Sequence, residues 1–294
     1  MVRESADETK RRGRPLPIVP NPTEYPSSIS RVGDAYCISF DNVARFEVCF
    51  ARKLVTIFDV GADTTSEALT HLLYDHVAPR ILAGAGELII HASAVEIAGR
   101  LAVFLGETGA GKSTLAASLH NAGHRLVGDD AAILAPSPNG FCGRSVYPSL
   151  RLYPESIAAV LGDDVLSAPM AHYSDKKRLS LPALDDADLS PIPLGGFFFL
   201  VDDDGDGQVG SRTLSPGHTC IGLIENSFAL DKDDADAAAK RMEKISHIAR
   251  EVPGYELSYP WDFNVLPKVH KEILARIHGQ ADQNGEDRTV SSNG

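Results

Sequence analysis

A glycine-rich stretch followed by a lysine and a serine is the part of the sequence that could bind a triphosphate. Gly106-x4-Gly111-Lys112-Ser113 matches the P-loop pattern. Glycines let the backbone turn where a Cβ would clash, so successive N–H groups can point at phosphate oxygens. Lys112 would supply a cation, and Ser113 a hydroxyl ligand for Mg²⁺. We therefore predict that the nucleotide is bound by Gly106, Glu107, Thr108, Gly109, Ala110, Gly111, Lys112, Ser113 and Thr114.

Two adjacent aspartates, Asp129 and Asp130, follow Lys112 by 17 and 18 residues. Phosphoryl transfer to a hydroxyl needs a group that accepts the hydroxyl proton, and a carboxylate can do this. Neighbouring positions on an extended chain point to opposite faces, so we expect the two acids to have different roles. We assign Asp130 as the base and place Asp129, with Ser113, beside the metal. The reverse order is an alternative, as is a role for either acid in capping or solvating a strand end.

Three further side chains are candidates for the same chemistry. His91 lies in an apolar segment, where it is either a core residue or a helper of the aspartates. Arg151 and Arg178 follow the aspartates along the chain. Either guanidinium could stabilise the charge of the transition state or hold an acidic substrate. A surface charge without a catalytic role is the alternative for each arginine.

To come together at one site, these residues need a strand before the loop, a helix after it and a strand that returns to the same edge of the sheet. Residues 101–105 (LAVFL) are wholly apolar, as in a buried strand. Residues 113–122 predict a helix that Gly123 ends, and residues 124–128 predict the returning strand. A right-handed crossover would keep this strand parallel to the first one. Both aspartates would then lie at the sheet edge that carries the loop, where open α/β sheets bind ligands.

The remaining pattern predicts an α/β protein with a small β-rich N-terminal region. Apolar and polar residues alternate over 35–60, which predicts antiparallel strands. Residues 66–82 predict a helix that Pro79 bends or ends. Residues 87–97 predict one continuous strand, and Trp261 is expected to pack against the last helix.

Four segments follow from these patterns. We expect a disordered leader (1–27), a small β-rich region with a helix (28–82), a P-loop kinase domain (83–278) and a disordered tail (279–294). The leader is rich in proline and charge, and the tail is polar.

Composition restricts the partners and the compartment. The net charge of −12 argues against general binding to nucleic acid or to an anionic membrane. No apolar run approaches the roughly 18 residues of a membrane span, and the N-terminus lacks the apolar core of a signal peptide. The four cysteines are scattered without a C-x-x-C spacing, which is typical of reduced thiols. We therefore expect a cytoplasmic protein.

The residues around the loop resemble the catalytic core of the HPr kinase/phosphorylase family. The resemblance covers H-A-S-A-V-x-I-x-G from His91, the P-loop, and A-G-H-x-L-x-x-D-D ending at Asp130. It implies a P-loop kinase core of the type shared with phosphoenolpyruvate carboxykinase, and transfer of phosphate from ATP to a protein serine. It also implies that Asp130 is the base, that His91 and Asp129 lie nearby, and that the chain assembles into homo-oligomers.

The sequence departs from that family after the aspartates. The glycine-rich signature of the bifunctional enzymes is absent, and YPSLRLYP (147–154) stands there instead. This segment and KKRLSLP (176–182) are similar to divergent HPr-kinase-like proteins, some of which are kinases of lasso-peptide maturation. The departure affects the expected phosphorylase activity and substrate docking more than the reaction class.

The sequence as a whole predicts an ATP- and Mg²⁺-dependent serine kinase whose partner is a protein or peptide with an acceptor serine. A kinase for a hydroxyl of a small molecule is one alternative, and a nucleotide-binding regulator without transfer is another. The identity of the acceptor, other phosphoryl donors, the reverse reaction and the oligomeric state are left open by the sequence.

Overall fold

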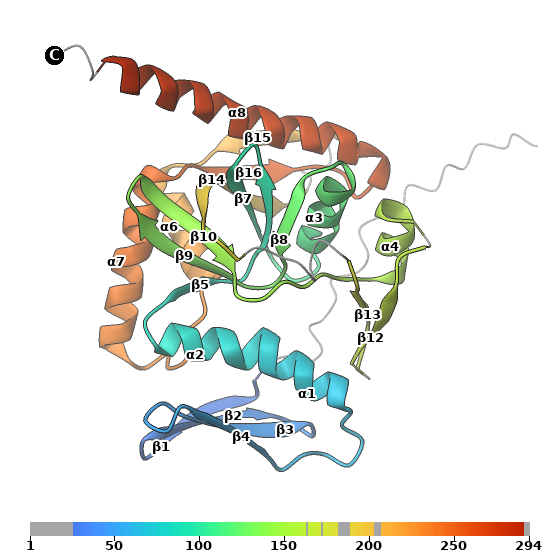
Figure 1. Ribbon diagram of the computed structural model, residues 1–294, viewed down its shortest axis with the longest axis vertical. Helices are drawn as coiled ribbons and strands as arrows, with labels where there is room; N and C mark the ends of the chain where they lie inside the picture. Colours follow the sequence, from blue (N-terminus) through green and yellow to red (C-terminus); the bar gives the residue numbers. More distant parts are fainter. Residues whose placement is uncertain (1–25, 163, 172, 182–188, 203–206, 291–294) are drawn as a thin grey trace, which may run out of the picture.

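The computed structural model describes residues 26–162, 164–171, 173–181, 189–202 and 207–290, and the side chains of these residues up to Gly279. Most of the predicted leader, residues 1–25, and the last four residues of the predicted tail lie outside the described residues. The described chain is a mixed α/β protein, as the sequence predicted (Figure 1).

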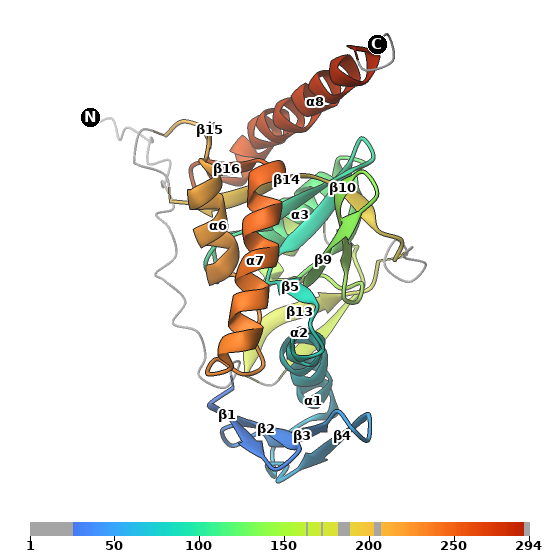
Figure 2. The same cartoon turned by 90° about the vertical axis from the view of Figure 1, so that its left-hand side faces the viewer.

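The N-terminal strands form an antiparallel sheet of their own. The sheet has the order β1 (Ser28–Val32), β2 (Ala35–Phe40), β3 (Ala44–Cys49) and β4 (Leu54–Phe58). Its apolar face, with Ile38 and Phe46 fully buried, packs against the helical segment that follows it in the chain. Figures 1 and 2 show this sheet below that helical segment, at one end of the molecule.

The helical segment has a widened turn in its middle. Thr65 caps α1 (Ser66–Leu72), a π-helical turn covers Leu73–Val77, and α2 covers Ala78–Gly84. Pro79 does not end the helical segment, which continues to Gly84, and it lies in the first turn of α2 directly after the π-turn. Single π-turns within helices are frequent at functional sites.

The large sheet has nine strands of mixed direction. Its main path runs β5-β9-β10-β14-β7-β6-β8, and β16 pairs with both β14 and β15. The central strand β14 (Ile192–Val201) is parallel to β7 (Arg100–Leu105) and to β16 (Gly254–Ser258). The other strands of this sheet are β5 (Leu88–Ile90), β6 (Ser93–Ile97), β8 (Arg125–Gly128), β9 (Ala132–Ser137), β10 (Gly140–Ser145) and β15 (Gly210–Thr213).

The predicted single strand over 87–97 is wrong, because the chain leaves the sheet at His91 and Ala92. The backbone N–H of His91 donates to the carbonyl of Asn226 at 2.7 Å, outside the ladder. Strand β5 before the break pairs with β9, and strand β6 after it pairs with β7 and β8. Both pairings of β6 are antiparallel, so β8 runs parallel to β7 as predicted but with β6 between them.

Helices cover both faces of the large sheet. Helices α3 (Lys112–Asn121), α4 (Pro154–Val160) and α8 (Leu266–Val290) contribute to one core, and α6 (Pro216–Glu225) and α7 (Ala235–Glu251) contribute to the other. A third sheet contains β11 (Arg151–Leu152), β13 (Ser174–Leu179) and β12 (Ser167–Ala171), in this order. No helix among the described residues is long and apolar enough to span a membrane.

Helix α8 continues to Val290, where the sequence predicted a disordered tail from 279. The apolar first half of this helix packs into the core through Val269, Ile273 and Ile277. The following residues include no proline to break the helix, but Gly279 and Gly285 lower its intrinsic stability there.

Candidate functional site

The glycine-rich loop connects β7 to α3 and lines a cavity of about 1580 Å³. Gly106, Gly109 and Gly111 have φ of 145°, 86° and 90°, which favour glycine. A Cβ on Gly106 would also lie 2.9 Å from the carbonyl oxygen of Leu200 on β14. Residues 106–114 all line the cavity, and the N-terminus of α3 opens into it. Free N–H groups and the helix dipole make such an end an anion site.

The ammonium of Lys112 is folded back on the loop. It donates to the carbonyl oxygens of Gly106 at 2.7 Å and Glu107 at 3.1 Å. Burial lowers the pKa of Lys112 to about 8, and the nearby Asp129 carboxylate opposes this effect. A polyphosphate in the cavity would replace the two carbonyls as the partner of this cation.

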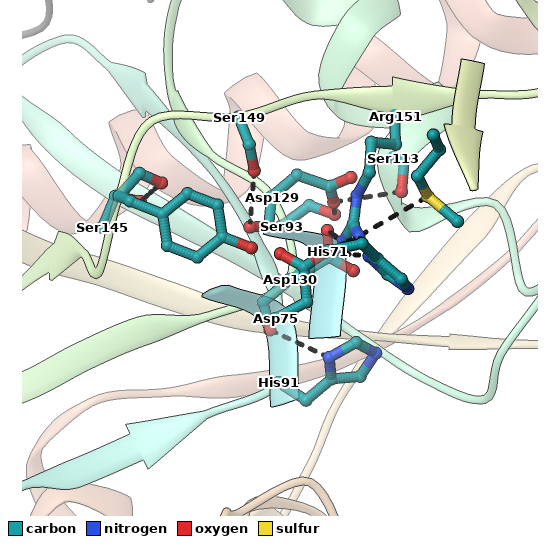
Figure 3. Close-up of polar contacts among 12 residues, drawn as sticks. His71, Asp75, His91, Ser93, Ser113, Asp129, Asp130, Ser145, Ser149 and Arg151 are labelled. Carbon is teal, nitrogen blue, oxygen red and sulfur yellow. Dashed lines mark hydrogen bonds and ion pairs between the residues drawn. The ribbon is translucent and has the colours of Figure 1, made fainter. Parts of the chain in front are cut away.

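Asp129 is buried beneath the loop, with an exposed fraction of 2%. Its Oδ1 accepts hydrogen bonds from Ser113 Oγ at 3.0 Å and from Ser93 Oγ at 2.5 Å (Figure 3). No cationic side chain among the described residues lies within ion-pair distance of it. A buried carboxylate without a cation is costly, so this environment fits a bound metal ion.

Ser93 was not predicted as a site residue. It lies on β6, and the antiparallel pairing of β6 with both β7 and β8 brings it next to Asp129. The insertion of β6 between these strands is not visible in local periodicity. The serine within the apolar run HASAV was the signal that could have identified it.

Asp130 faces the main cavity, whereas Asp129 does not line it. Its φ of 72° lies in the left-handed region, which turns the chain sharply after β8. Asp130 lines the cavity, whereas Asp129 is not among the described lining residues. The two neighbouring carboxylates therefore point into different environments, and only Asp130 forms an ion pair, with Arg151.

Arg151 bridges two acids inside the protein. Its exposed fraction is 4%, Nη2 pairs with Asp130, and Nη1 pairs with Asp75 of the π-turn (Figure 3). Nδ1 of His71 lies 2.7 Å from Nη1, and His71 also contacts Asp75 one helical turn away. Asp75 and His71 are both buried at 4% exposure. We refer to His71, Asp75, Asp130 and Arg151 as the arginine network.

The sequence missed the helical half of the arginine network. His71 and Asp75 are spaced i, i+4 on a segment that was predicted as an ordinary amphipathic helix. A polar pair at this spacing on the apolar face was the available signal. Its partner, Arg151, is distant in the sequence and joins it only in the folded protein.

His91 holds the backbone of Asp130. Its Nδ1 lies 2.9 Å from the carbonyl oxygen of Asp130. Because a carbonyl only accepts, Nδ1 carries the proton, and Nε2 of the neutral ring has a free lone pair. Burial, with a smaller contribution from the Lys112 ammonium, lowers the pKa of His91 to about 3. The ring is therefore uncharged at neutral pH, and it lines the cavity near Asp130.

Arg178 of β13 is the backbone partner of Arg151 on β11, but its side chain faces another cavity. It lines a second cavity, of about 540 Å³, together with Tyr74 and Tyr147. Its neighbour Lys176 lines the main cavity instead, with the ammonium 5.5 Å from the centre of the Tyr153 ring. Of the two predicted arginines, only Arg151 is brought to the loop and the aspartates.

Trp261 also differs from the prediction that it packs against the last helix. It lines the main cavity together with Tyr259 and Phe263, in the segment between β16 and α8. The core beneath α8 includes Tyr259 and Val265 among its described side chains but not Trp261.

Among solved structures, the chain is similar to the HPr(Ser) kinase/phosphatase from Coxiella burnetii. The alignment covers 70% of this chain and 98% of that chain, with 17% sequence identity and a TM-score of 0.36. No family model and no curated protein matches the chain. The functional proposal therefore rests on the side chains of the site.

Proposed function

We propose that the protein transfers a phosphoryl group from ATP to a serine hydroxyl of a protein or peptide. One observation carries this proposal. Asp129 contacts Ser113 beneath the loop, while Asp130, the next residue, opens into the cavity that the loop lines. A phosphate cradle, a metal ligand and a carboxylate for the acceptor are thus assembled within one site.

The loop and Asp129 would hold the triphosphate and Mg²⁺. The hydroxyl of Ser113 and the carboxylate of Asp129 are oxygen ligands of the kind that Mg²⁺ takes, with the remaining positions left to phosphate and water. When bound, the ion would neutralise charge on the phosphates. The N–H groups of the loop and Lys112 would stabilise the same charge from the side of α3.

Asp130 would accept the proton of the acceptor hydroxyl. As the serine oxygen bonds to the γ-phosphorus, the bond from that phosphorus to the bridging oxygen breaks and ADP leaves. The hydroxyl proton moves to the carboxylate of Asp130. Arg151 and His91 would fix this carboxylate through the ion pair and through the hydrogen bond to its backbone carbonyl.

The cavity is large enough to hold an acceptor in addition to the nucleotide. Its volume of about 1580 Å³ exceeds the ~300–1,000 Å³ of most small-molecule pockets, so a second substrate has room beside the triphosphate. One observation favours a nucleotide-binding regulator instead. Asp130 is already paired with Arg151, which makes its carboxylate less available to a hydroxyl proton.

Transfer of label from γ-labelled ATP tests these possibilities. The protein is incubated with Mg²⁺ and, separately, with cell-extract protein, a serine-peptide library and a metabolite pool. We expect acid-stable label on protein or peptide serine. Label confined to metabolites would replace the protein kinase with a small-molecule kinase. Nucleotide binding without any labelled acceptor would favour the regulator.

The role of Asp130 is tested with Asp130→Asn. We expect this variant to lose about 10²–10⁴-fold in transfer rate while its affinity for ADP stays close to that of the wild type, because the amide cannot take the proton. Glu155→Gln is the matched control, since Glu155 is an exposed acid on the rim of the same cavity. Undiminished transfer by Asp130→Asn would rule out Asp130 as the base.

A further inference from the structure

Three aromatic residues, Tyr259, Trp261 and Phe263, follow the last strand of the large sheet and line the main cavity. They lie at the same edge of the sheet as the glycine-rich loop because of the way the strands pair. Strand β14 is parallel to both β7 and β16, and Phe199 of β14 is in register with Leu105 of β7 and with Glu256 of β16. Strand β16 therefore runs two residues beyond the level at which β7 gives way to the loop.

Two of these aromatic side chains lie close to the loop. A Cβ built on Gly111 would lie 3.4 Å from Tyr259 Oη and 4.0 Å from Trp261 Cη2. Gly111 is the residue that caps α3, at the anion-binding end of that helix. The aromatic pair thus flanks the place where the phosphates of a nucleotide would enter, on the wall formed by the segment between β16 and α8.

The aromatic residues differ in how they are supported. Tyr259 packs against the core, and burial raises the pKa of its phenol, so the hydroxyl stays protonated. Trp261 is half-buried, and Phe263 has an exposed fraction of 38%. Neither belongs to a core cluster among the described residues. Large apolar rings that open into a cavity beside a phosphate cradle are suited to contact an apolar, planar group.

We propose that Trp261, backed by Tyr259, is the platform for the nucleobase of the nucleotide. This inference rests on the proposed function, because it takes the phosphates to be bound by residues 106–114. The class of ligand is a nucleobase, since every base offers a π-face to an aromatic ring and stacking does not read the base edges. Asp130 then remains open to the acceptor in the same cavity.

The test uses the full chain, in which Trp261 is the only tryptophan. Its emission is followed while Mg-ADP, Mg-GDP, Mg-UDP or Mg-tripolyphosphate is added. We expect the three nucleotides to quench the emission on binding, because the base stacks on the indole. Tripolyphosphate, which has no base, should bind with little quenching.

Calorimetric affinities of variants complete the test. Trp261→Ala should weaken ADP binding about ten-fold or more, as expected for the loss of one stacking contact, and should weaken tripolyphosphate binding much less. Trp261→Phe should recover most of the affinity for ADP. Phe58→Ala, which removes an aromatic side chain from the N-terminal sheet, should leave ADP binding unchanged.

Three results would overturn the inference, and they are distinguishable. Unchanged ADP affinity in Trp261→Ala would remove the platform while the nucleotide site stands. An equal loss of affinity for ADP and tripolyphosphate would show that Trp261 supports the loop instead of the base. If the wild type bound neither ligand, the proposed function would fall, and the nucleobase platform with it.

Discussion

Replacing Arg151 with methionine tests whether the arginine network is a buried, coupled unit. The substitution keeps an unbranched side chain but removes the cation between Asp75 and Asp130. The side chains of Arg151 and Asp75 are 5% and 3% exposed, so little water can replace the lost cation at Asp75, whereas Asp130, at 16%, faces the cavity. Breaking a buried ion pair from one side costs about 3–5 kcal/mol, because the remaining charge stays buried.

The matched control is Arg212→Met. Arg212 also pairs with a carboxylate, Glu256 at 2.9 Å, but its side chain is 71% exposed. Exposed pairs of this kind contribute about 0–1 kcal/mol. The two variants therefore make the same chemical change at sites that differ mainly in burial.

Urea unfolding followed by circular dichroism at pH 7.5 measures the free energy of unfolding of both variants. We expect a lower midpoint for Arg151→Met with an unchanged slope, which reports lost stability and not a changed unfolded state. A loss of about 3–5 kcal/mol is large against the roughly 5–15 kcal/mol that stabilises a typical domain. An Arg151→Met variant no less stable than Arg212→Met would refute the buried network.

A double variant tests the coupling within the network. Asp75→Asn removes one of the charges that Arg151→Met leaves without a partner, so the double variant should lose less stability than the sum of the single losses. Residues in one such network typically couple by about 0.5–3 kcal/mol. Strict additivity would show that Asp75 and Arg151 act independently.

Two further predictions concern the loop and α6. Lys112 has a pKa of about 8 against an ordinary 10.5, so raising the pH from 7 to 9.5 removes its charge and should weaken tripolyphosphate binding, measured by calorimetry. The folded state binds fewer protons than the unfolded state between these two pKa values, so the contribution of Lys112 to the free energy of unfolding should rise with pH there. Lys112→Arg should bind tripolyphosphate with a pH-independent affinity. A pH-independent affinity of the wild type would contradict the lowered pKa of Lys112. Gly222→Ala should cost about 1–3 kcal/mol in thermal or urea unfolding, because its Cβ would lie 2.3 Å from the Phe199 ring. Gly217→Ala in the same helix meets only Ser215 Oγ at 3.8 Å and should be close to neutral, and equal losses at both positions would contradict the packing argument.

Local pattern was sufficient for the elements around the loop. The apolar run before Gly106 forms β7, the segment after Gly111 forms α3, and the strand that returns ends at Gly128, directly before Asp129. Each of these depends on residues close in sequence, where glycine conformation and hydrophobic runs act directly. The α/β class and the parallel direction of β7 and β8 followed from the same local signals.

Contacts between distant segments could not be predicted in this way. Periodicity gave no sign that the chain leaves the sheet at His91, because the segment is apolar on both sides of the break. Trp261 was expected to pack against the last helix, but the two-residue overhang of β16 carries it to the cavity, and that register is set by β14. Ser93 reaches Asp129 only because β6 is inserted between β7 and β8.

The sequence by itself determined the glycine-rich loop and the two acids that follow it, because these depend on residue type and short spacing. The tertiary structure alone decided which acid faces the cavity and which cation meets it. Arg151 lies 76 residues after Asp75 and 21 after Asp130, and the three meet because a buried charge without a partner is costly. Such a choice is made by the packing of the whole chain, which no local pattern encodes.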